Sequence, residues 1–105
     1  MLSVMELRPG LTVDESALAA FAVRNGIIRL AVFGSVLRPD FTLESDVDIL
    51  VEFDTSQVPG LFEMAAMERE LDEMLGRPVD LRTCRDLSRY FRDDVAAQAR
   101  VVYAA

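Results

Sequence analysis

Apolar residues recur along the chain at two different spacings, and the spacing within each segment predicts its secondary structure. Leu18, Phe21 and Ala22 follow the three- and four-residue spacing of one helix face. Before them, Thr12-Val13-Asp14-Glu15 has the pattern of a capping box, in which Thr12 begins the helix. A first helix is therefore predicted at about residues 13–25.

A run of apolar residues from Ile27 to Phe33, interrupted by Arg29, predicts a largely buried strand. The strand is expected to stop at Gly34. Ser35 to Arg38 then predicts a short helical turn, which Pro39 closes. Gly34-Ser35 therefore stands where a strand ends and a helical turn begins.

The next predicted strand, residues 46–53, has two unlike faces. Its apolar side chains share one face and consist of Val47, Ile49, Val51 and Phe53. Asp46 and Asp48 share the other face, a few ångströms from each other. Two such charges ~4 Å apart repel by about 1 kcal/mol in water and about 4 kcal/mol at a partly buried site. We therefore expect a cation beside them.

The remainder of the chain predicts a helix at residues 61–75, ending at Gly76, a short strand at 78–82, a helix at 86–99 and a closing strand at 101–103. The apolar stripe of the 61–75 helix consists of Met64, Met67, Leu71, Met74 and Leu75, and we interpret it as core. No repeat or linker divides the sequence. Residues 1–105 are predicted to form a single domain of α/β (α+β) class, with a mixed sheet of about four strands flanked by helices.

The composition, 51% hydrophobic and 28% charged, fits a soluble globular domain. All 11 basic residues are Arg, so a Schiff-base lysine, a Ser/His dyad and a His-ligated zinc are excluded. The net charge of −7 disfavours direct nucleic-acid binding. Cys84 is the single cysteine, and no apolar run approaches the ~18 residues of a membrane span. We expect a cytoplasmic protein without membrane contact.

Asp80 repeats the pattern of the two earlier aspartates, because Val79 and Leu81 take the core face of its strand. The segment between Asp48 and Asp80 includes one helix, which is the length of a crossover between neighbouring strands. Three carboxylates, those of Asp46, Asp48 and Asp80, are thus predicted to converge. Ligand sets made only of oxygen select hard cations, so we expect two Mg²⁺ ions, with Mn²⁺ as a substitute.

A phosphate site is predicted at Gly34-Ser35, because backbone N–H groups at the start of a helical turn favour an anion and glycine permits its close approach. Arg38, one turn further on, could reach the same phosphates, and an ion pair with a nearby carboxylate is an equal alternative. These parts together describe metal-assisted transfer of a nucleotide or phosphoryl group.

Gly34-Ser35, ten residues, and then Asp46-Val47-Asp48 match the GS-x10-DxD signature of the DNA polymerase β-like nucleotidyltransferases. With this composition the match arises by chance about 2 times in 1,000. With its short length, the chain resembles the minimal nucleotidyltransferase (MNT) antitoxins that are paired with HEPN-domain toxins. Ser45 fills the position before DxD that is often Ser in the family.

The resemblance implies a polymerase β-like palm fold, in which Asp46, Asp48 and Asp80 are catalytic residues that hold metal. It further implies that Gly34 and Ser35, with Arg38 and Ser45 as additional candidates, bind the nucleotide. The implied reaction is transfer of AMP from ATP to a tyrosine of a HEPN toxin.

Two other interpretations remain at this stage. The protein could be a non-catalytic antitoxin that neutralises its partner by occlusion, or the aspartates could belong to an ordinary solvated strand face. Helical projection places Phe62 on the polar side of its helix and Tyr90 at the edge of an apolar stripe, so both are candidate partner contacts.

Overall fold

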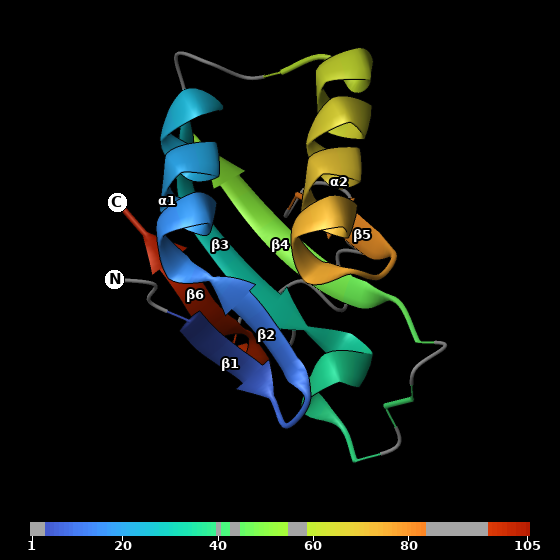
Figure 1. The fold of residues 1–105 in the computed structure, drawn as a ribbon. Coiled ribbons are helices and arrows are strands. Elements are labelled where there is room, and N and C mark those ends of the chain that lie inside the picture. Colours follow the sequence, from blue (N-terminus) through green and yellow to red (C-terminus); the bar gives the residue numbers. More distant parts are fainter. Residues whose placement is uncertain (1–3, 40, 43–44, 55–58, 84–96) are drawn as a thin grey trace.

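The computed structural model describes residues 4–39, 41–42, 45–54, 59–83 and 97–105. In chain order its elements are β1 (Val4–Arg8), β2 (Leu11–Asp14), α1 (Glu15–Arg24), β3 (Ile27–Phe33), the 3₁₀ turn η1 (Gly34–Leu37), β4 (Val47–Phe53), α2 (Leu61–Leu75), β5 (Val79–Arg82) and β6 (Arg100–Ala104). Figure 1 shows α1 and α2 on one face of a twisted sheet, with β1 and β2 next to α1.

The main sheet has the strand order β5-β4-β3-β6. Strand β3 is antiparallel to both of its neighbours, whereas β4 and β5 are parallel, so α2 is the crossover between two adjacent strands. The predicted mixed sheet of four strands flanked by helices is confirmed.

The hydrophobic core fills the space between this sheet, the two helices and the β1–β2 hairpin, which contributes Leu7, Leu11 and Val13. Strands β3, β4 and β5 contribute Leu30, Val32, Val47, Ile49, Val51, Val79 and Leu81, and the elements facing them contribute Leu18, Phe21, Ala22, Met67, Leu71 and Leu75. The predicted apolar stripe of α2 is confirmed as core, because Met67, Leu71 and Leu75 are buried and Met64 and Met74 pack against the same cluster. Every second residue of β4 and β5 is therefore left on the opposite face.

The amino-terminal part of the chain corrects two predictions. Residues 4–14 form the β1–β2 hairpin, which was not predicted, and the first helix begins at Glu15, not at residue 13. Thr12 does not cap the helix, because it pairs with Glu6 in the hairpin. Asp14 is the N-cap instead, and its Oδ1 accepts the N–H groups of Ser16 and Ala17 at 2.9 and 3.1 Å.

Strand β3 and helix α2 have the predicted bounds, and the other boundaries differ by one residue, apart from one segment that is not covered. The strand predicted at 46–53 begins at Val47, so Asp46 precedes it, and the closing strand runs from Arg100 to Ala104. The structure does not describe residues 84–96. Most of the helix predicted at 86–99 lies there, and so does Tyr90. Within the described part of the chain, no helix is long and apolar enough to cross a membrane.

Candidate active site

Asp48 and Asp80 lie side by side on the sheet face opposite the helices. Their Cα atoms are direct partners in the parallel β4–β5 ladder, and Asp48 is also the partner of Phe33 on β3. Both aspartates are partly exposed, between buried apolar neighbours that face the core. The predicted crossover is confirmed, and it aligns two of the three predicted metal ligands at one level of the sheet.

Gly34 packs directly against the Asp48 carboxylate. Its φ of +69° lies in the left-handed region, which other residues adopt only at a cost. A Cβ atom at this position would overlap Asp48 Oδ2 and lie 3.3 Å from Cγ. Only a glycine therefore lets the turn after β3 approach this carboxylate so closely.

The rest of the phosphate motif lies in η1, whose Gly34–Leu37 span is one residue earlier than the predicted turn. The Ser35 side chain is outside the described part of the structure. Arg8 donates from Nη1 to the carbonyl oxygens of Val36 at 3.1 Å and Arg38 at 3.0 Å, which anchors the end of the turn. Arg38 borders an open groove of about 550 Å³, together with Arg8 and Arg100.

Asp46 is an exposed residue immediately before β4. The turn that leads to it is closed by Ser45, whose N–H donates to the Thr42 carbonyl at 3.1 Å and whose Oγ accepts the Thr42 N–H at 3.1 Å. Ser45 therefore has a structural role in setting where Asp46 leaves the turn.

Phe41 anchors the segment that joins the two halves of the motif. The guanidinium groups of Arg8 and Arg77 each lie 4.6 Å from the centre of its ring. Arg77 also donates to the Thr42 carbonyl at 3.2 Å. Sequence reasoning missed this cluster, because three residues distant in the sequence meet only in the folded chain.

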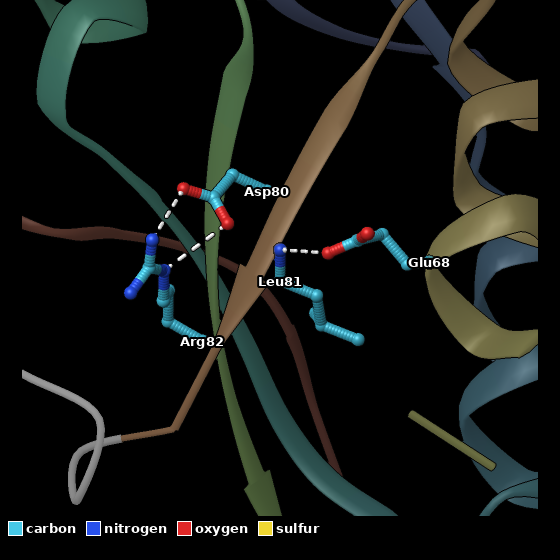
Figure 2. A network of polar contacts seen from close by, with 4 residues as sticks. All are labelled: Glu68, Asp80, Leu81 and Arg82. Carbon is cyan, nitrogen blue, oxygen red and sulfur yellow. Dashed lines mark hydrogen bonds and ion pairs between the residues drawn. The ribbon is translucent and has the colours of Figure 1, made fainter. Parts of the chain in front are cut away.

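Arg82 is the second group that sequence reasoning missed. It pairs with Asp80 through two bonds, Nε to Oδ1 at 3.1 Å and Nη2 to Oδ2 at 3.2 Å. Figure 2 shows the two side chains facing each other above β5. The signal was present in the sequence, because residues two apart on a strand share a face. The cation predicted from the sequence was placed beside Asp46 and Asp48, whereas Arg82 pairs with Asp80.

Two carboxylates of α2 hold the outer edge of β5. Asp72 Oδ1 accepts the Val79 N–H at 2.7 Å, and Glu68 Oε2 accepts the Leu81 N–H at 2.9 Å; Figure 2 includes the second bond. Residues four apart on a helix are about 6 Å apart along its axis, close to the rise of two strand residues. This match satisfies edge N–H groups that would otherwise lack partners and fixes the strand that carries Asp80.

The donors present fit a hard divalent cation. Asp48 and Asp80 offer only carboxylate oxygens, from neighbouring strands at the same register, and Gly34 borders one of them. In the part of the chain that the structure describes, no three carboxylate, thiol or imidazole side chains are grouped as a metal site, so the structure brings Asp48 and Asp80 together but does not show the predicted convergence of all three aspartates. Both oxygens of Asp80 are bonded to Arg82.

Comparison with known proteins defines the class of the molecule. The family model of the nucleotidyltransferase domain matches residues 15–103. The chain therefore belongs to the nucleotidyltransferase domain family, and the predicted enzyme class is confirmed.

Individual relatives show which members of the nucleotidyltransferase family this chain is similar to. The protein adenylyltransferase MntA of Thermococcus cleftensis is 37% identical over 81 residues, which span 77% of each chain. A solved structure described as a candidate minimal nucleotidyltransferase is 33% identical, with a TM-score of 0.67 over 81% of this chain and 85% of that one. The predicted resemblance to minimal nucleotidyltransferases is thus confirmed.

A more distant solved structure contains the tri-AMPylated HEPN toxin of Shewanella oneidensis in complex with its MNT antitoxin. The matched chain is 20% identical, with a TM-score of 0.61 over 87% of this chain and 70% of that one. At this identity the likeness shows a shared fold.

Proposed function

We propose that this protein is an antitoxin that transfers AMP from ATP to a tyrosine hydroxyl of a partner HEPN toxin, with Mg²⁺ as its cofactor. The observation that carries the proposal is the alignment of Asp48 with Asp80, with Gly34 packed against the Asp48 carboxylate. The names of its relatives, a protein adenylyltransferase and an MNT antitoxin bound to an AMPylated toxin, support the same reaction.

In this proposal Asp46, Asp48 and Asp80 would hold two divalent ions, whose chemistry would be to neutralise the charge of the triphosphate and of the leaving pyrophosphate. Mn²⁺ can replace Mg²⁺, because both accept an oxygen-only ligand set. The backbone of Gly34 and Ser35, with Arg38 on the same turn, binds the phosphates beyond the reacting one.

The tyrosine oxygen forms a bond to the α-phosphorus, and the bond between that phosphorus and the oxygen bridging to the β-phosphate breaks. Pyrophosphate leaves with the electron pair of the broken bond. The proton of the hydroxyl passes to a carboxylate oxygen of Asp80. The protein thus contributes positioning and charge, which supply most of the catalysis in phosphoryl chemistry.

The acceptor has to be delivered by a partner, and α2 offers a surface for it. Leu61 and Phe62, at the start of α2, are 82% and 86% exposed. A groove of about 300 Å³ next to them is lined by Leu61, Met64, Ala65, Glu68 and Leu81. Exposed apolar side chains of this size are typical of a protein contact. A partner bound there would lie against the outer edge of β5, the strand that carries Asp80.

The test is to incubate the protein with labelled ATP, Mg²⁺ and its HEPN partner, and to search the partner by mass spectrometry. We expect AMP on a tyrosine with the wild-type protein and none with Asp46→Ala/Asp48→Ala. If the double mutant still neutralises the toxin fully and neither protein modifies it, occlusion is the mechanism and the proposal is wrong.

A further inference from the structure

Arg82 binds the Asp80 carboxylate, which is one of the ligands that the proposed metal site needs. Both oxygens of Asp80 are engaged by one guanidinium, at 3.1 and 3.2 Å, in the fork geometry that is characteristic of Arg. The two side chains are 37% and 47% exposed, so water and ions can reach the pair. A metal ion can therefore reach Asp80, but it has to compete with Arg82 for its oxygens.

The register of the sheet keeps Arg82 apart from the phosphate turn. Asp80 is aligned with Asp48 and Phe33, next to Gly34, whereas Arg82 is aligned with Leu50, whose partner on β3 is Ala31. Arg82 thus lies two positions further along β5, away from Gly34. Its backbone therefore stands on the side of Asp80 away from the phosphate turn.

We propose that Arg82 is an internal counter-cation that holds Asp80 in the metal-free protein and is displaced when a divalent ion binds, so that it sets the metal affinity of this site. The inference rests on the metal site of the proposed function. Two effects act in the same direction: the guanidinium occupies the ligand oxygens, and its positive charge repels the incoming ion. In water, a unit charge about 6 Å away weakens the binding of a divalent ion about 10-fold, and salt screening at physiological ionic strength reduces this to about 3-fold.

A second arginine–carboxylate pair, on the same sheet face as Asp48 and Asp80, provides a matched control. Arg29 on β3 pairs with Glu52 on β4, Nε to Oε2 at 2.9 Å, with exposures of 56% and 47%. Its chemistry and exposure are similar to those of the Arg82–Asp80 pair, but it lies near the other end of β3, away from Asp48. Arg29→Gln therefore removes the same charge without releasing a predicted metal ligand.

The experiment is a titration of the nucleotide-free protein with Mn²⁺, followed by electron paramagnetic resonance. We expect Arg82→Gln to bind Mn²⁺ about 3- to 10-fold more tightly than the wild type, and Arg29→Gln to match the wild type. In an Asp80→Asn background, Arg82→Gln should bring a smaller gain, because the contested ligand is gone and only the charge effect remains. Thermal unfolding of each variant checks that the fold is intact.

The inference is overturned if Arg82→Gln binds Mn²⁺ no more tightly than Arg29→Gln does, or if neither variant binds Mn²⁺. A gain as large in the Asp80→Asn background as in the wild type would also overturn it, since charge alone would then explain the effect. None of these measurements uses ATP or a partner. Tighter Mn²⁺ binding combined with no AMP transfer would therefore support the role of Arg82 while rejecting the proposed function.

Discussion

Along strands β4 and β5, successive residues point to opposite sides of the sheet, and the two sides have different roles. Val47, Ile49 and Val51 of β4 are buried against the helices, whereas Asp48 faces the other way and is partly exposed. The same strands thus provide both the core and the site. The difference predicts that substitutions on the core face change the free energy of unfolding, and that substitutions on the site face change metal-dependent chemistry.

The largest expected effect is on the site face. Asp48→Asn keeps the shape of the side chain but removes a charged metal ligand, so AMP transfer should fall by about 1,000-fold, which is about 4 kcal/mol of transition-state stabilisation. Transfer to the HEPN partner is measured with labelled ATP. Glu52→Gln is the control, because it removes a charge from the same face of β4 at its other end. Transfer close to the wild-type rate in Asp48→Asn would show that the metal-ligand assignment is wrong.

The next effect in size lies in the core. Leu71 is fully buried in α2 beneath the sheet, and Leu71→Ala should lower the free energy of unfolding by about 2–5 kcal/mol through lost burial and the cavity left behind. Urea unfolding measures this loss. Glu73→Ala, at an exposed position of the same helix, should change stability by less than about 0.5 kcal/mol. Equal losses in the two variants would contradict the assigned core.

The smallest effect tests a position that belongs to both regions. Gly34→Ala places a residue with a side chain at φ +69°, which costs about 1–2 kcal/mol, and directs its Cβ at the Asp48 carboxylate. Stability should therefore fall modestly, and Mn²⁺ binding should weaken as well. Gly10→Ala is the matched control, with φ +84° and no atom within 4 Å of its Cβ position. It should lose stability alone, and a loss of Mn²⁺ binding in Gly10→Ala would undermine the comparison.

Much of the fold could be predicted because the main sheet strands and helix α2 carry strong local patterns. Helix α2 begins and ends where its apolar stripe and Gly76 predict, and Gly76 adopts the expected left-handed conformation at φ +70°. The β1–β2 hairpin was missed although Pro9-Gly10 separates two strands that alternate apolar and polar residues, because the strands are short and β2 overlaps the capping pattern of Thr12 to Glu15, which was assigned to the first helix. The overlapping capping patterns of Thr12 and Asp14 could be resolved only by pairing, since Thr12 is taken up by the hairpin.

The sequence alone determined the chemistry that the protein can offer: a glycine-serine turn, aspartates on the polar side of two strands, and no histidine or lysine to suggest another mechanism. Spacing within one segment carries this information, because the alternation of a strand is local. The tertiary structure decided which of these groups meet. Only the parallel register of β4 and β5 aligns Asp48 with Asp80, and only the edge position of β5 explains why Glu68 and Asp72 bind its N–H groups. Such contacts join residues far apart in the chain, so their geometry depends on how the core packs and cannot be obtained from local pattern.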